Sequence, residues 1–274
     1  MSEHIASVNS PKTGKDQVRK LTLAAMLTAV VVVLALLGTA IKFGVFNVNL
    51  ALVPIVVGAA LLGVGYGAWF GLVNALVILL SGDAAPFLAV SAFGTVVTVV
   101  AKGVLAGLVS GLVFKAMNRY NKYAAVILAA LVCPLVNTGV FLIGCRLFFW
   151  DTIAQWAQGA NASSTFSYAI VGLVGANFLL ELAINVILAP AIARILGFSQ
   201  DKAVSLLVYG VVLLLVGLAA GIFALTLIHR VKAGENPGQV ANPMTRYLVM
   251  CVVSAVVAAG GAALTVLGLK RKQK

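Results

Sequence analysis

The sequence predicts an all-α integral membrane protein. Three observations support this prediction: the composition, the length of the apolar runs and the placement of the basic residues. Of the 274 residues, 62% are apolar and 9% are charged, and the mean hydropathy is +1.11. A soluble domain usually carries about 25% charged residues. The composition therefore excludes a soluble domain and a disordered chain, and the length has room for roughly eight membrane crossings of about 20 residues each.

Eight apolar segments lie between charged and turn residues, and we expect each to form a membrane helix. They cover residues 21–43, 48–64, 66–81, 88–115, 123–147, 167–196, 203–228 and 244–269. The second and third segments are short and are joined at Gly63, Gly65 and Gly67, which favours two helices that meet in a tight glycine turn. The alternative is one broken, re-entrant element.

The basic residues predict that both ends of the chain are cytoplasmic. In that orientation the cytoplasmic segments hold thirteen Lys and Arg residues and the outer segments hold five, in agreement with the positive-inside rule. The basic tails then bind anionic lipid heads, so the net charge of +12 requires no nucleic-acid partner. We expect four regions: an N-terminal tail (1–20), a six-span bundle (21–197), a further two-span hairpin (203–269) and a basic tail (270–274).

Catalytic and metal-binding motifs are missing from the sequence. Cys133, Cys145 and Cys251 lie in apolar runs without CxxC spacing, and His4 and His229 lie outside the apolar segments. Hydrolase, metalloprotease and P-loop motifs are also missing. We therefore expect no enzyme activity, no cofactor and no metal, and a chain that does not use ATP by itself.

Charged residues inside the apolar segments indicate where a site could lie. A charge at the bilayer centre costs about 2.5–3.5 kcal/mol on insertion scales, yet Lys102 and Glu181 both lie near the middle of a predicted helix. Helical spacing gives three polar faces: Ser91, Thr95, Thr98 and Lys102 on the fourth helix, Asn137 and Phe141 on the fifth, and Asn177, Glu181 and Asn185 on the sixth. Arg146 lies toward the outer end of the fifth helix.

These faces leave more than one interpretation open. Lys102 and Glu181 form an interhelical pair that fixes the helix register, or the three faces enclose a substrate cavity, or the pair borders such a cavity. In the predicted orientation most of these polar groups lie in the outer half of the membrane, which favours a cavity open to the outside. A further alternative is an ion-coupled secondary transporter in which Glu181 relays protons.

The outer connections add candidate residues. Asn47 and Asn49 follow the first helix, and Trp150 and Trp156 lie in the loop expected before the sixth helix. Tryptophan at this depth typically anchors a protein at the membrane interface, and the alternative is a ring that covers a ligand.

Small residues recur four positions apart, which places them on one helix face where a second helix can approach closely. This spacing is found at Gly63, Gly67 and Gly71, at Gly103, Gly107 and Gly111, at Gly217 and Gly221, and at Ala25 and Ala29.

Several of these motifs follow one another along the chain in an order that is typical of one family of membrane proteins. Arg19-Lys20 precedes the Ala25-x-x-x-Ala29 helix, Pro54 precedes the glycine-rich turn, and Lys102-Gly lies in the fourth helix. Cys133-Pro134-Leu-Val-Asn137-Thr138 lies in the fifth helix, and the segment from Asn177 to Pro190 in the sixth. With this order, residues 18–197 resemble the substrate-binding S component of energy-coupling factor (ECF) vitamin transporters.

The resemblance implies a six-helix bundle that binds a micronutrient from outside. It also implies a complex with one membrane coupling subunit and two cytoplasmic ATPases. The surface that contacts the coupling subunit in the family maps to Ala25 and Ala29, and the loop that gates the pocket maps to residues 44–49. The 203–269 hairpin departs from the six-helix pattern.

The predicted substrate site collects the polar candidates. Its members are Asn47, Asn49, Ser91, Thr95, Lys102, Asn137, Phe141, Arg146, Asn177 and Glu181. Lys102 and Arg146 offer positive charge, and Asn137 and Asn177 offer amides. This combination suits an anionic or amide-bearing vitamin, with pantothenate or a folate as the first candidates.

Overall fold

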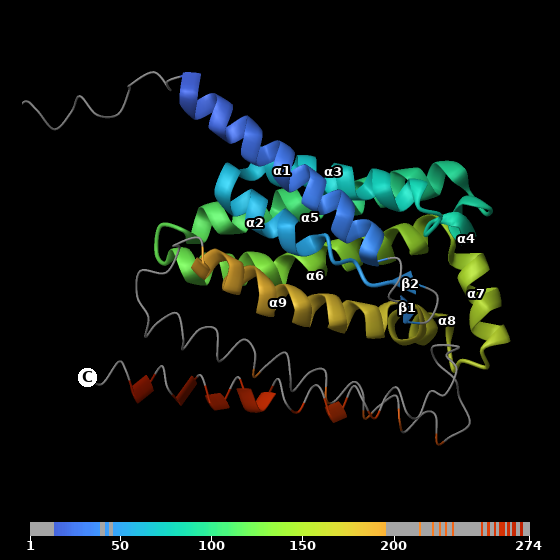
Figure 1. The fold of residues 1–274 in the computed structure, drawn as a ribbon. Helices are drawn as coiled ribbons and strands as arrows, with labels where there is room; N and C mark the ends of the chain where they lie inside the picture. The colour runs from blue at the N-terminus through green and yellow to red at the C-terminus, as the bar shows by residue number, and fades with distance from the viewer. Residues whose placement is uncertain are drawn as a thin grey trace, which may run out of the picture.

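The computed structural model describes residues 14–38, 42–43 and 46–195, and beyond these only isolated helical positions between Leu214 and Lys270. Nearly all of the described chain is helical (Figure 1). The helices are α1 (Gly14–Gly38), α2 (Leu52–Leu62), α3 (Val64–Leu80), α4 (Ala85–Leu88), α5 (Ala92–Met117), α6 (Lys122–Phe148), α7 (Trp150–Gly159), α8 (Thr165–Ser167), the π-helix η1 (Tyr168–Gly175) and α9 (Ala176–Ile195). Residues 1–13, residues 271–274 and most of the 203–269 hairpin lie outside the described residues, and α1 begins at Gly14, within the segment 1–20 that was expected to be a tail.

Membrane-crossing helices are present in the described part, as the sequence predicts. Three are long and apolar enough to cross a bilayer: Lys20–Gly38, Ala92–Met117 and Lys122–Phe148. A fourth candidate consists of Thr165–Gly175 and Asn177–Ile192, which meet at a bend of 40°. The remaining two apolar helices are shorter, and α2 with 11 residues extends only about 16 Å, roughly half of the hydrocarbon core.

Helices α2 and α3 are two separate helices that fold back on each other at Gly63. This glycine has φ 110°, a left-handed backbone conformation that side-chain-bearing residues rarely adopt. Across the turn, a Cβ at Gly58 would collide with the Phe70 ring, and a Cβ at Gly67 would crowd Ala59. The glycine turn expected from the sequence therefore forms, and the two helices pack closely along their length.

The glycine series of α3 and α5 face each other. A Cβ at Gly67 would meet the carbonyl oxygen of Gly107, and a Cβ at Gly71 would meet that of Gly103, so the two backbones are in contact. The sequence predicts such a close approach from the spacing of four. Glycine is required here because any side chain would separate the helices.

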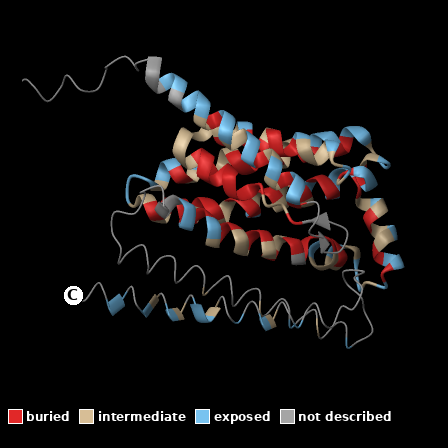
Figure 2. Cartoon of the chain, in the orientation of Figure 1, coloured by how far each residue is buried: buried red, intermediate tan, exposed pale blue. Residues whose placement is uncertain are grey.

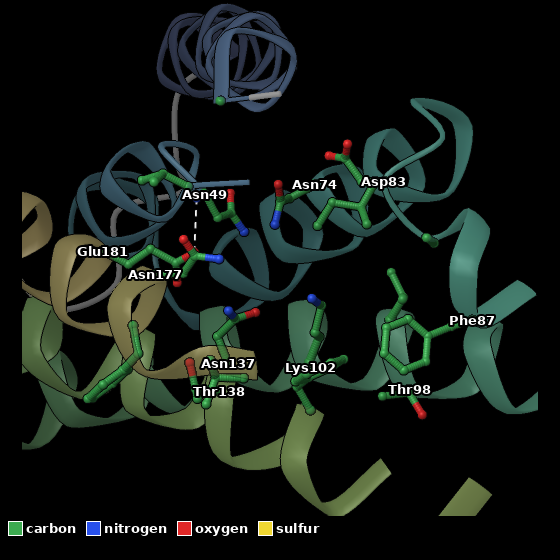
Figure 3. A pocket seen from close by; sticks show the side chains of 18 of the residues that line it. Asn49, Asn74, Asp83, Phe87, Thr98, Lys102, Asn137, Thr138, Asn177 and Glu181 are labelled. Atoms are coloured by element: carbon green, nitrogen blue, oxygen red, sulfur yellow. Dashed lines mark hydrogen bonds between the residues drawn. The ribbon is translucent and has the colours of Figure 1, made fainter. Parts of the chain in front are cut away.

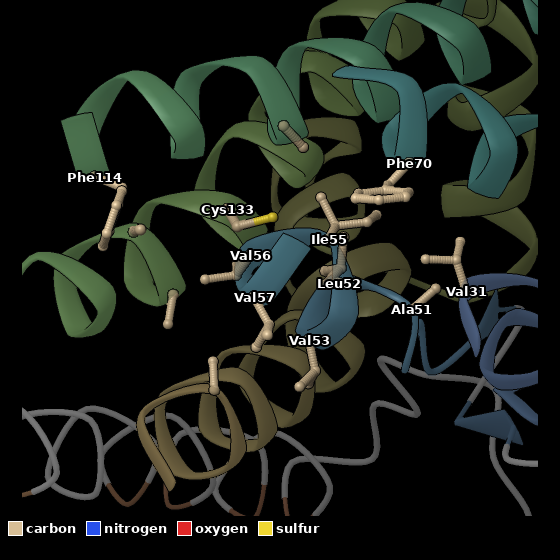
Figure 4. Packing of buried hydrophobic residues seen from close by; sticks show 14 of the residues in the cluster. Val31, Ala51, Leu52, Val53, Ile55, Val56, Val57, Phe70, Phe114 and Cys133 are labelled. Carbon is tan, nitrogen blue, oxygen red and sulfur yellow. The ribbon is translucent and has the colours of Figure 1, made fainter. Parts of the chain in front are cut away.

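The hydrophobic core surrounds α2, which is buried on all sides. Leu52, Ile55 and Val56 are fully buried and pack against side chains from α1, α3, α5, α6 and α9 (Figure 4). A helix that is apolar all round is stable only when other helices enclose it. Figure 2 shows the buried residues concentrated in this central layer, whereas α1 exposes much of its surface.

One end of the bundle is closed by short elements. The strands β1 (Lys42–Phe43) and β2 (Phe46–Asn47) pair between α1 and α2, and α4, α7 and α8 lie at the same end (Figure 1). The sequence analysis expected a loop where α7 forms. This segment is instead an amphipathic helix that buries Ile153 and Ala157 and leaves Asp151 exposed. Because polar and apolar residues alternate in it, it does not stand out as an apolar run in the sequence.

Candidate functional site

A cavity lies in the half of the bundle that carries β1, β2 and α4 (Figure 3). It holds about 890 Å³ of space not occupied by protein atoms, with the open solvent at its mouth included. Its polar lining comes from α3, α5, α6, α9 and two connecting segments. These residues are Asn49, Asn74, Asp83, Thr95, Thr98, Lys102, Asn137, Thr138, Asn177 and Glu181.

The wall formed by α5 follows the spacing seen in the sequence. Thr95, Thr98 and Lys102 line the cavity, but Ser91 does not. Ser91 is the N-cap of α5, and its Oγ accepts a hydrogen bond from the backbone N–H of Gly94 at 3.1 Å. The hydroxyl is therefore used to start the helix, which is the usual role of serine at this position.

Lys102 faces the cavity without an ion pair to Glu181. Its ammonium nitrogen lies 5.1 Å from the centroid of the Phe141 ring on the neighbouring helix. Among the residues that the structure describes, no nitrogen–oxygen contact of salt-bridge length joins Lys102 to Glu181. Lys102 and Glu181 therefore do not form the interhelical ion pair considered in the sequence analysis. Both side chains instead line the same cavity.

Glu181 makes a different contact. Its carboxylate accepts a hydrogen bond from the backbone N–H of Asn49 at 3.0 Å, and its side chain is only 6% exposed (Figure 3). The Asn49 side-chain oxygen in turn accepts from the N–H of Ala51 at 3.3 Å, at the start of α2. Glu181 therefore connects α9 to the segment that leads into the core helix.

Several buried polar atoms of residues that line the cavity have no hydrogen-bond partner within the part of the chain that the structure describes. They are Asn49 Nδ2, both amide atoms of Asn74, Thr98 Oγ1, Asn137 Oδ1 and both amide atoms of Asn177. An unsatisfied buried polar group costs about 1–3 kcal/mol. Seven such atoms around one cavity raise the free energy of the unliganded protein. A polar ligand that binds them would lower it.

The π-helix η1 directly precedes the ligand-facing turn of α9. Val174 of η1 and Asn177 of α9 both line the cavity, on either side of the junction between the two elements. A π-helical turn is less stable than an α-helical one and occurs often at functional sites.

Asn185, the third polar residue on the predicted face of this helix, does not line the cavity. It lies one turn after Glu181, and its side-chain nitrogen donates to the carbonyl oxygen of Glu181 at 3.2 Å.

An aromatic cluster forms the wall next to α7. The Phe87 ring makes edge contacts with Phe141, Phe149 and Trp156, at centroid distances of 5.7, 4.9 and 5.5 Å. Phe87, Phe141 and Phe149 line the cavity, whereas Trp156 supports them from behind. Tilted ring contacts of this kind fix the geometry of an apolar wall.

Seven of the ten predicted site residues line the cavity. They are Asn49, Thr95, Lys102, Asn137, Phe141, Asn177 and Glu181. Ser91 and Arg146 do not, and the side chain of Asn47 lies outside the described residues. Arg146 follows Phe141 by five residues, about 1.4 helical turns, so it leaves the shared face. It is exposed and stacks on Trp150, 5.0 Å from the ring centroid.

The predicted site left out four polar lining residues: Asn74, Asp83, Thr98 and Thr138. Thr98 was placed on the polar face of the fourth helix but not in the site. Asn74 could have been found, because it is a lone amide in the apolar segment 66–81 and is fully buried. Asp83 lies in the connection between α3 and α4, and spacing along a helix says nothing about such a position. Thr138 follows Asn137 directly and was noted only as part of a motif.

Two further predictions concern surfaces and metals. Ala25 and Ala29 are exposed on α1, and neither lines the cavity. Within the described part of the chain, no group of three His, Cys, Asp or Glu side chains could hold a metal ion. Cys133 and Cys145 are buried and are not joined in a disulfide.

Comparison with known proteins assigns the family. Residues 19–193 match a family model described as ECF transporter, substrate-specific component. The match covers more than half of the chain and includes every residue that lines the cavity. Comparisons with curated proteins and with solved structures each gave no match.

Proposed function

We propose, because the chain belongs to the substrate-specific components of ECF transporters, that its cavity captures a small anionic vitamin from outside the cell. The family consists of multi-pass membrane subunits of importers and not of enzymes. The observation that supports an anionic substrate is the Lys102 ammonium, which faces a cavity bordered by unpartnered amides. Pantothenate and folates are the first candidates.

Lys102 favours a carboxylate on the α5 side of the cavity, and the described lining also holds two acidic residues, Asp83 and Glu181. Lys102 is the one Lys, Arg or His among the described lining residues. A carboxylate beside it forms a charge-assisted hydrogen bond, which is shorter and roughly twice as strong as a neutral one. Glu181 is engaged with the Asn49 backbone, so its charge is held toward the opposite side.

The amides favour a substrate that has several hydrogen-bonding groups. Asn74 and Asn177 each present an unpartnered donor and an unpartnered acceptor. Pantothenate offers one carboxylate, one amide and two hydroxyls. A folate offers carboxylates and an aromatic pterin, which suits the wall made by Phe87, Phe141 and Phe149.

Transport requires partners that this chain does not supply. Membership of the family implies an ECF module, and we expect one membrane coupling subunit and two cytoplasmic ATPases. The exposed Ala25 and Ala29 are the proposed contact with the coupling subunit. With both termini in the cytoplasm, the cavity opens to the outside, as substrate capture requires.

A thermal-shift series on the purified chain tests the substrate class. The series uses pantothenate, folate, the cationic vitamin thiamine and the alcohol analogue of pantothenate, in which CH2OH replaces the carboxylate. We expect pantothenate or folate to raise Tm and the alcohol to have little effect. A shift with thiamine and none with either anion would overturn the proposal.

The transport role is tested separately in proteoliposomes. Uptake of the bound vitamin should require the coupling subunit and ATPases and should be indifferent to a proton gradient. Gradient-driven uptake by this chain alone would favour the secondary transporter considered in the sequence analysis.

A further inference from the structure

Glu181 borders the substrate cavity, but its carboxylate is engaged with the protein backbone. We propose that Glu181 is a positioning residue: it holds the backbone of Asn49 so that the Asn49 side-chain amide faces the cavity, and it is not itself a ligand for the substrate. The role of Asn49 in this inference rests on the proposed function of the cavity.

The segment from Val48 to Ala51 is fixed from several directions. The close approach of Val48 to α1 requires glycine at position 38, because a Cβ there would collide with the Val48 carbonyl oxygen. Asn49 is held from α9 by Glu181, which is 132 residues away in the sequence. Val48 and Ala51 are 2% and 0% exposed, so the segment is anchored on both sides of Asn49.

The two polar atoms of the Asn49 side chain have different environments. Its oxygen accepts from the Ala51 N–H and closes the turn into α2, while its Nδ2 is buried, has no hydrogen-bond partner among the described residues and points toward the other lining side chains (Figure 3). The orientation of this donor depends on the backbone at Asn49, because the turn and the Glu181 contact both act there. Without the Glu181 contact, both the segment from Val48 to Ala51 and the orientation of the Asn49 Nδ2 donor are therefore less restricted.

A buried carboxylate is well suited to hold this segment. A carboxylate accepts a backbone N–H more strongly than a neutral oxygen does, and a buried peptide N–H without a partner is costly. A carboxylate has two acceptor oxygens, so holding the backbone and binding a substrate are distinguished by the variants described below and not by the contact alone. The contact at 3.0 Å shows that one of its oxygens is already used.

Two variants of Glu181 separate positioning from direct contact. Glu181→Gln keeps an acceptor oxygen of nearly the same shape and removes the charge, whereas Glu181→Met keeps the length and removes the acceptor. Amide-resolved hydrogen exchange of the unliganded protein should show Asn49 protected in the wild type and in Glu181→Gln. In Glu181→Met we expect exchange about 10-fold faster or more, since a hydrogen bond to a charged group is worth about 1.5–3 kcal/mol.

Asn185→Leu is the matched control, because Asn185 lies one turn further on α9, is buried and does not line the cavity. It should leave Asn49 exchange unchanged. Equal exchange at Asn49 in the wild type and Glu181→Met, with Glu181→Met still folded by its melting curve, would overturn the inference.

Binding of pantothenate, or of folate if folate is the vitamin that shifts Tm, completes the test. Affinity should survive in Glu181→Gln and fall in Glu181→Met. An equal loss in both variants would make Glu181 a charged ligand and would also overturn the inference. If the wild type binds neither vitamin, the substrate proposal fails, and the exchange measurement still decides the role of Glu181.

Discussion

The ammonium of Lys102 lies 5.1 Å from the centroid of the Phe141 ring, and the two side chains reach the cavity from neighbouring helices. A cation over an aromatic face gains about 0.5–2 kcal/mol, less than the insertion cost of a charge at membrane depth. The Phe141 ring therefore offsets only part of the free-energy cost of placing the Lys102 charge at this depth. A substrate carboxylate can add to this arrangement without displacing a protein carboxylate from Lys102.

Lys102→Met should remove the preference for a carboxylate. The affinity for the anionic vitamin should fall about 10–100-fold, because a charge-assisted hydrogen bond is lost, while the weak affinity for the alcohol analogue should change little. Titration calorimetry on both ligands measures this difference. Arg146→Met is the control, since Arg146 is exposed and does not line the cavity. Loss of affinity in Arg146→Met instead would place the anion elsewhere.

Asn74→Leu and Asn177→Leu should separate binding from stability. Each wild-type amide is buried and, among the described residues, has no hydrogen-bond partner at either polar atom, so an apolar side chain of similar size should leave the Tm of the unliganded protein equal or higher. Affinity for the vitamin should fall at the same time. Thermal melts with and without the vitamin measure both effects. A lower unliganded Tm would show that these amides are structural.

The sequence predicted much of the cavity because helical spacing is a geometric property of the chain. Thr95, Thr98 and Lys102 follow one another at three and four residues, and the structure places all three on the cavity wall. Two of the predicted site residues lie near helix ends and do not line the cavity. Ser91 caps α5, and Arg146 lies in the last turn of α6, beyond the face that Asn137 and Phe141 share.

Contacts between distant segments could not be predicted from spacing. The hydrogen bond from Asn49 to Glu181 joins a turn to a helix and depends on how the whole bundle closes. The edge-on aromatic wall likewise depends on α7, which the sequence did not reveal as a helix. The glycine series was visible in the sequence, but its partner helix was not.

Gly103→Ala should destabilise the protein, because its Cβ would be forced against the Gly71 carbonyl oxygen. Overpacking of this kind costs about 1–3 kcal/mol. Gly139→Ala on α6 is the matched control, since its Cβ would meet nothing within 4 Å, and it should be neutral or stabilising. Denaturation in detergent measures both. Equal stability of the two variants would show that α3 and α5 have room to separate.

Ala25→Leu and Ala29→Leu should block assembly without affecting capture. Both alanines are exposed on α1 and do not line the cavity, so a larger side chain should leave vitamin affinity unchanged. Co-purification with the ECF module and uptake by the complex should both be lost, because a coupling helix could no longer approach. Loss of vitamin binding in either variant would mean that the alanines pack within the bundle.

Reporter fusions should place both the α5–α6 connection and the C-terminus in the cytoplasm. The prediction follows from the distribution of basic residues, thirteen in the expected cytoplasmic segments against five outside. Fusions after Asn121 and after Lys274 carry a reporter that is active on one side of the membrane only. An external signal from either fusion would contradict the proposed orientation.

The contact between the α3 and α5 backbones also sets the spacing of two residues that line the cavity, Asn74 and Lys102. Gly71 precedes Asn74 by three residues, and Gly103 directly follows Lys102, so both lining residues are attached close to the points where the helices touch. The spacing of these two backbone positions is therefore set by the glycine contact and not by a bound molecule. We expect the proposed substrate site to favour molecules whose anionic and polar groups suit this spacing.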